Sequence, residues 1–139
     1  MYKINPDLQV GVEYNPLAND VGPLFNWRVL RETTGQPAII LGTSSDRIGT
    51  PSGRAFYVTF SKTVSDGIGL YVGASYSQYE DKILIPAGAS FRLSDDWSAL
   101  LLFDGVKFHP MVTYSWERYS VTFILTQLKQ PGVNFSVGF

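Results

Sequence analysis

The sequence contains no cysteine and few charges, and these absences narrow the class of protein. Without cysteine there is neither a disulfide framework nor a thiolate metal site. Charged residues make up 17% of the 139 residues, against roughly 25% in ordinary soluble domains. The formal net charge is −1, so no basic surface indicates a nucleic-acid partner. With a single histidine there is no histidine cluster either, and we expect neither a metal nor a cofactor.

Long apolar runs are also missing. No segment approaches the roughly 18 consecutive apolar residues that a membrane-spanning helix needs. Residues 1–6 have no apolar core and form no signal peptide, so we expect the chain to be a mature or recombinant form. The length suits one domain covering residues 1–139.

Aromatic residues are abundant, at 14%, and apolar residues alternate with small polar ones along most of the chain. A period of two predicts β-strands, and clusters of Gly, Pro, Asp and Ser separate them. Ten strands are predicted, at 7–14, 23–32, 37–44, 54–63, 68–78, 82–93, 97–103, 106–116, 118–127 and 131–139. Because 37–44 alternates poorly, eight strands is the second possibility.

Three predicted turns indicate which residues of neighbouring strands lie opposite each other, and so which face of the sheet each side chain occupies. Asp104-Gly105 and Trp116-Glu117 predict two-residue hairpin loops, and 94–96 predicts a three-residue loop. The expected cross-strand pairs are Phe103–Val106, Tyr114–Tyr119 and Leu93–Trp97. In the second and third pairs both residues lie on the apolar side of their strands, as Phe103 does in the first. Pro86 and Pro110 fall inside predicted strands, where we expect a bulge or frayed pairing.

The two faces of the predicted sheet differ in a way that favours a membrane. The polar face carries Gly, Ser, Thr, Tyr and Asn, whereas a soluble exterior would carry Lys, Glu and Asp. Only a closed barrel lets a sheet satisfy its backbone polar groups in lipid. We therefore predict an all-β, closed, antiparallel up-and-down transmembrane β-barrel with its apolar face outward. The expected lipid-interface aromatics are Tyr14, Trp27, Phe60, Tyr76, Phe91, Trp97, Phe108, Tyr114, Tyr119 and Phe139. A soluble lipocalin-like ligand-binding barrel, with the apolar face inward, is the alternative.

A barrel of this size has a narrow lumen that its own side chains fill. The expected lumen charge network consists of Glu13, Arg28, Lys82, Arg92, Lys107 and His109, because interior charges need partners. The sequence presents no catalytic constellation, so we expect no enzymatic activity. A narrow passive channel for small solutes is the alternative function.

Three segments resemble the YjbH-type exopolysaccharide-associated outer-membrane proteins. They are NWRVLRET at 26–33, PAIILG at 37–42 and YVTFSK at 57–62. In addition, the final strand ends on Phe139, similar to the signal by which outer-membrane barrels are recognised for insertion. The resemblance implies a bacterial outer-membrane location and a role linked to polysaccharide secretion. Membrane lipid and an envelope or polysaccharide-export partner are the expected contacts.

Overall fold

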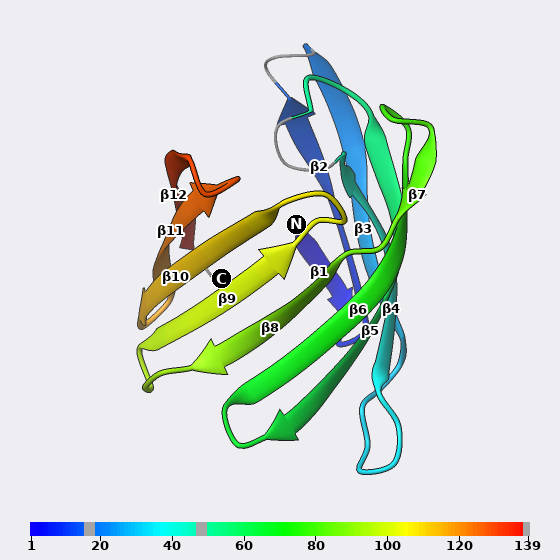
Figure 1. Ribbon diagram of the computed structural model, residues 1–139. Coiled ribbons are helices and arrows are strands. Elements are labelled where there is room, and N and C mark those ends of the chain that lie inside the picture. The colour runs from blue at the N-terminus through cyan, green and yellow to red at the C-terminus, as the bar shows by residue number, and fades with distance from the viewer. Residues whose placement is uncertain (16–18, 47–49, 138–139) are drawn as a thin grey trace.

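A computed structural model describes residues 1–15, 19–46 and 50–137, and these form one antiparallel sheet with no helix among them. The sheet is strongly curved, so that its strands surround a concave side (Figure 1). Its strands are β1 (Tyr2–Asn5), β2 (Leu8–Asn15), β3 (Asp20–Leu30), β4 (Ala38–Ser45), β5 (Arg54–Ser65), β6 (Ile68–Ser77), β7 (Lys82–Leu84), β8 (Ala87–Arg92), β9 (Trp97–Phe103), β10 (Phe108–Trp116), β11 (Tyr119–Thr126) and β12 (Gln130–Val137).

The strands form a meander in which each pairs with its neighbours along the chain. The order is β1-β2-β3-β4-β5-β6-β8-β9-β10-β11-β12, and short β7 pairs only with β6. The predicted all-β, antiparallel up-and-down sheet is therefore confirmed. Its closure by hydrogen bonds is not, because β1 and β12 each have one strand neighbour among the described residues.

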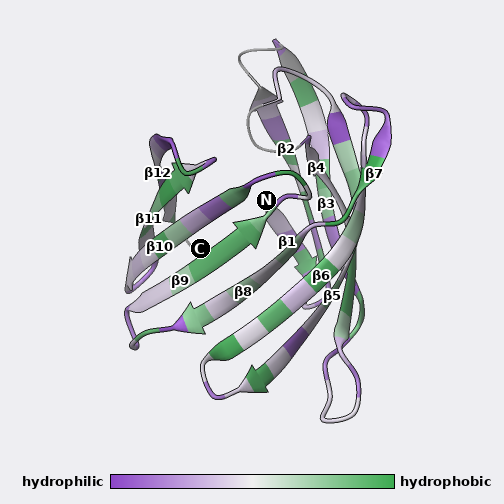
Figure 2. Ribbon diagram, in the orientation of Figure 1, coloured by the Kyte–Doolittle hydropathy of each residue, from purple (hydrophilic) through white to green (hydrophobic). Residues whose placement is uncertain are grey.

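Alternating side chains give the sheet two different faces. On β6, Leu70, Val72 and Tyr76 are exposed, whereas Gly73 and Ser77 are buried. Figure 2 shows the same alternation as bands of differing hydropathy along the strands. The buried face is concave, since residues from β4, β5, β6 and β9 line one shared hollow of about 350 Å³.

Two glycines make room for tyrosine rings on the concave face. Tyr57 of β5 lies opposite Gly42 of β4, and Tyr71 of β6 lies opposite Gly88 of β8. A Cβ on Gly88 would lie 2.5 Å from the Tyr71 ring. Each tyrosine thus occupies the space that a side chain on the facing strand would need, which allows the sheet to curve tightly.

The predicted strands are present, with two differences. β1 was not predicted, and the predicted strand 82–93 is divided into β7 and β8 at Pro86. The register against β6 is the same on both sides of this break, and the Pro86 carbonyl accepts the Gly73 N–H at 2.9 Å. Pro110 continues the pairing with β9, but the β10–β11 ladder begins only at Met111. Both prolines therefore fray the pairing locally, as expected of a residue without an N–H, and neither causes a bulge.

The turn-based pairings are correct in phase but not all in register. Leu93 donates its N–H to the Trp97 carbonyl, as predicted. Phe103 pairs with Phe108, and Tyr119 with Trp116, so these two predictions were wrong by two residues. A shift of two leaves every side chain on its predicted face.

Gly42 offers a direct test of the close packing on the concave face. Gly42→Ala is expected to lower the free energy of unfolding by about 1–3 kcal/mol, because overpacking forces neighbours apart. The new Cβ would lie 2.5 Å from the Tyr57 ring and 2.6 Å from the Phe25 carbonyl oxygen. Urea unfolding, followed by tryptophan fluorescence, measures the change. Gly35→Ala is the control, since nothing lies within 4 Å of its Cβ, and equal losses for both variants would contradict the packing argument.

Candidate functional site

His109 is fully buried at one end of the sheet, where it links two turns. Its Nε2 lies 2.8 Å from Asp104 Oδ2, and its Nδ1 accepts the Gln127 N–H at 3.2 Å. Because Nδ1 accepts a hydrogen bond, the neutral ring carries its proton on Nε2 and donates it to the carboxylate. We call His109 together with the turns 104–107 and 127–129 the histidine rim.

Asp104 organises the β9–β10 turn of the histidine rim. Its Oδ1 accepts the N–H groups of Val106 and Lys107, both at 2.8 Å, and Gly105 takes a positive φ of 95°. Burial would raise the pKa of Asp104, but the hydrogen bonds from Lys107, His109 and Val106 outweigh it and lower that pKa. The carboxylate is therefore charged, with Oδ1 engaged by its own turn and Oδ2 by His109 of β10.

The second turn of the histidine rim is held from the same side. Lys107 Nζ donates to Gln127 Oε1 at 2.6 Å. Gln127 and Leu128 both adopt positive φ, at 56° and 58°. Since His109 Nδ1 accepts the N–H of Gln127, side chains from β10 and the turn before it fix this strained turn. Both ring nitrogens of His109 are thereby occupied, which favours a structural role over proton transfer.

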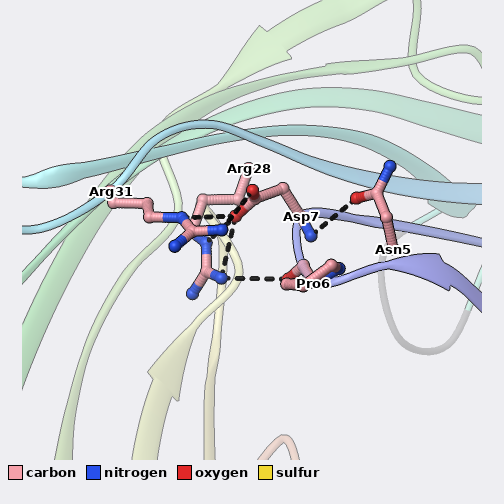
Figure 3. Close-up of polar contacts among 5 residues, drawn as sticks. All are labelled: Asn5, Pro6, Asp7, Arg28 and Arg31. Carbon is pink, nitrogen blue, oxygen red and sulfur yellow. Dashed lines mark hydrogen bonds and ion pairs between the residues drawn. The ribbon is translucent and has the colours of Figure 1, made fainter.

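A cluster of two arginines and one aspartate lies at the opposite end of the sheet. Arg28 Nε donates to Asp7 Oδ1 at 2.9 Å, and Arg31 donates to both Asp7 oxygens, at 3.0 and 2.6 Å. Figure 3 shows both guanidinium groups beside the Asp7 carboxylate, with Arg28 also reaching the Pro6 carbonyl. We call these three residues, with the turns 6–7 and 31–37, the arginine rim.

The arginine rim ties the β1–β2 turn to the end of β3. Hydrogen bonds from Arg31 and then Arg28 lower the pKa of Asp7 from 3.8 to about 2. The same pairing raises the pKa of Arg31. Nearby, Glu32 accepts the Thr63 N–H at 2.9 Å, and Lys62 Nζ donates to the Thr33 and Thr34 carbonyls. These contacts fasten the β3–β4 turn to β5.

The six charged residues predicted to share a lumen network do not meet at one place. His109 and Lys107 lie in the histidine rim, and Arg28 lies in the arginine rim. Glu13 accepts the Ser45 N–H at 3.0 Å, and Lys82 forms an ion pair with Glu80. Arg92 is exposed at the end of β8, where its backbone N–H donates to the Gly67 carbonyl.

Sequence reasoning missed three further charged residues that make close polar contacts. Asp7 accepts hydrogen bonds from both Arg28 and Arg31, and Asp46 accepts the Tyr79 N–H at 2.9 Å. Asp7 follows Pro6 in a turn, and that position is the one sequence signal that could have marked it.

Aromatic rings gather on the convex face of β9 to β12, at the same end of the sheet as the arginine rim. Trp97 and Tyr114 have ring centroids 4.9 Å apart, and Trp116 stacks between Tyr114 and Tyr119 at 5.5 and 5.6 Å. Phe135 of β12 completes this group, 6.0 Å from Tyr119. Of the predicted interface aromatics, those exposed are Tyr14, Trp27, Phe60, Tyr76, Phe91, Trp97 and Phe108. Tyr114 and Tyr119 are half-buried in the ring group, and Phe139 lies outside the described residues.

Comparison with known proteins found no matching family model, no matching curated protein and no matching solved structure. Within the described ranges, no helix is long and apolar enough to cross a membrane. The part of the chain that the structure describes likewise has no group of three His, Cys, Asp or Glu side chains placed to hold a metal ion.

The histidine rim predicts a specific effect of Asp104→Asn. An asparagine can still accept from the Val106 and Lys107 N–H groups, but it then turns an NH₂ group toward His109 Nε2. The neutral imidazole ring has one nitrogen that accepts and one that carries a proton. It therefore cannot accept from both the Gln127 N–H and the new NH₂ group, and one hydrogen bond is lost. We expect a loss of about 1–3 kcal/mol in stability and faster amide exchange at Gln127. Asp95→Asn, in the exposed β8–β9 turn, is the matched control, and unchanged exchange at Gln127 in Asp104→Asn would refute the linkage.

The arginine rim predicts a response to acid. Since the pKa of Asp7 is lowered to about 2, the native state binds fewer protons than the unfolded chain between that value and the ordinary 3.8. The stability that the pairing gives is present above the ordinary value and is lost as the pH falls toward 2. The urea midpoint of Asp7→Asn should therefore depend less on pH in this window than that of the parent chain. Asp66→Asn in the exposed β5–β6 turn serves for comparison, and parallel pH curves for the parent and Asp7→Asn would contradict the assignment.

Proposed function

We propose that this chain is an integral β-barrel component of a bacterial outer membrane, with lipid against its convex face and its own side chains filling its interior. The observation that carries the proposal is the exposure of large apolar side chains. They occur on every strand except β4, and Phe123 and Val133 are 54% and 66% exposed. A soluble monomer rarely exposes an apolar surface that extends around the whole molecule.

The buried face supports the same orientation. Its fully buried side chains are His109 and Ser77, and Asp46 and Asp104 are nearly so, as are the apolar Ala38, Ala55 and Leu84. A soluble lipocalin-like barrel would place the large apolar and aromatic side chains there instead. Polar groups inside and apolar groups outside are the arrangement of a barrel in lipid.

The positions of the aromatic residues along the strands also suit a membrane. One group of rings lies at the end of the sheet that carries the arginine rim, and Phe103 and Phe108 lie beside the histidine rim with centroids 4.9 Å apart. Aromatic residues at both ends of an apolar band are typical of the two interfaces of a bilayer.

We further propose a structural, non-enzymatic role in the envelope. Both nitrogens of His109 and both oxygens of Asp104 are occupied by groups of the protein itself, which leaves no free acid–base pair there. The resemblance of 26–33, 37–42 and 57–62 to exopolysaccharide-associated proteins suggests a polysaccharide-export component as the partner.

Phe123→Arg tests the lipid-facing surface. In lipid, an arginine near the middle of an outward strand costs about 2–4 kcal/mol, whereas an exposed position in water tolerates it. We expect the parent chain to form a β-rich species in micelles whose gel mobility changes on boiling, and Phe123→Arg to form less of it. Glu117→Arg is the control, since Glu117 lies in the β10–β11 turn outside the apolar band.

Two results would overturn the proposal. If the protein is monodisperse and β-rich in plain buffer, its apolar face does not require lipid, and the membrane proposal fails. A stable, large conductance in single-channel recordings would show that the interior is open and would favour the channel alternative.

A further inference from the structure

The two edge strands of the sheet differ in a way that bears on how it closes. β1 has four residues, all exposed, and its register against β2 shifts between Lys3 and Asn5. β12 has eight residues, and both its apolar and its polar sides are exposed, including Phe135 and Asn134. Among the described strands β12 pairs only with β11, so one edge of its backbone has no strand partner and could accept a further strand.

Strand direction decides which strand that can be. Along the meander the direction alternates, and β1 and β12 stand at the two ends of a path of eleven described strands. They therefore run the same way and could pair only in parallel. β2 runs opposite to β12, so that β2 and β12 can form the antiparallel pair that an up-and-down barrel requires.

β2 and β12 also match in length and phase. Each has eight residues, so full overlap places Leu8 opposite Val137 and Asn15 opposite Gln130. Val12 then lies opposite Val133, and both are exposed on the convex face. On the other face Gly11 comes opposite Asn134.

The register of the whole sheet supports this pairing. From Val10 of β2, successive cross-strand partners lead through β3, β4 and β5 to Tyr76 of β6. From Val133 of β12, they lead through β11, β10, β9 and β8 to Ile68, eight residues earlier on the same strand. Val12 lies two residues beyond Val10, so pairing Val133 with Val12 adds two residues to this difference. The ten strands then close with a total register stagger of ten residues. When the stagger equals the number of strands, the strands tilt by about 36° to the barrel axis, which is within the range of closed barrels.

We propose that β12 pairs with β2, Val12 opposite Val133, to close a ten-stranded barrel in the membrane, and that β1 is an edge cover which leaves β2 when this happens. The inference rests on the proposed membrane function. In water β1 protects the unpaired backbone groups of β2 from association. Its four residues span about 13 Å, too short for the roughly 30 Å hydrocarbon core. The hydrogen bonds of Asp7 to Arg28 and Arg31 hold the turn while β1 moves.

Paired cysteines test the closure cleanly, because the full chain has none of its own. Val12→Cys with Val133→Cys should form an intramolecular disulfide in most molecules on oxidation in micelles, since directly opposed residues have the required Cα separation. Val12→Cys with Phe123→Cys is the matched control: both face outward, but β11 is one strand further away, and no cross-link is expected.

A second pair tests the release of β1. Tyr2 and Val10 are cross-strand partners, so Tyr2→Cys with Val10→Cys can be oxidised before micelles are added. This lock should abolish the heat-modifiable species, and a reductant should restore it. Formation of the heat-modifiable species with the lock intact would overturn the release of β1.

The remaining outcomes separate this inference from the membrane proposal. A heat-modifiable chain could cross-link Tyr2→Cys to Val133→Cys, or give only cross-linked dimers. Either result would place the chain in the membrane with β12 beside β1 or beside a second copy, and would overturn the β2–β12 pairing. Efficient cross-linking of Tyr14→Cys rather than Val12→Cys to Val133→Cys overturns the proposed register. Absence of a heat-modifiable species even from the cysteine-free chain is a failure of the membrane proposal itself.

Discussion

Backbone pairing between strands is the constraint on which the rest of this structure depends. Each strand bonds to its neighbours with little slippage, so the alternation of one strand sets that of the next: Trp27 lies opposite Leu41, and Leu41 opposite Val58. A slip of one residue anywhere would exchange the two faces from that strand onward. The irregularities of β3 and β5 lie near the arginine rim, where they do not disturb the central register.

Curvature then determines which side chains the concave face can hold. Space there is limited, so that Tyr57 and Tyr71 can lie inside only where the facing strand offers Gly42 and Gly88. Charges are placed at the ends of the sheet, since turns provide unpaired backbone N–H and C=O groups as partners. Asp104 accepts two N–H groups of its own turn, and Lys62 donates to carbonyls of the β3–β4 turn. In a narrow interior, charges without such partners would carry a large desolvation cost.

The strands and their phase could be predicted from the sequence, because alternation is a local property. The loop lengths at Asp104 and Trp116 could not, since they depend on the side-chain hydrogen bonds of Asp104 and on the positive φ of Glu117. β1 was missed because four residues carry too little periodicity to distinguish a strand. The grouping of the charges was missed for a different reason: Arg28 and Arg31 reach Asp7 across 21 and 24 residues of sequence, and only the register brings them together.

The two ends of the sheet differ in the length of their connections, and this bears on orientation in the proposed membrane. The end of the sheet that carries the arginine rim has the two-residue connections 6–7, 66–67 and 117–118 as well as the longer connection 31–37, whereas the other end carries 46–53 and 78–81. Outer-membrane barrels place short turns toward the periplasm and longer loops outside. In a ten-stranded barrel of β2 to β12, counting β7 and β8 as one interrupted strand, β2 begins and β12 ends at the end that carries the arginine rim. The two-residue turns and both strand ends then share one side, which an eleven-stranded sheet that includes β1 cannot achieve.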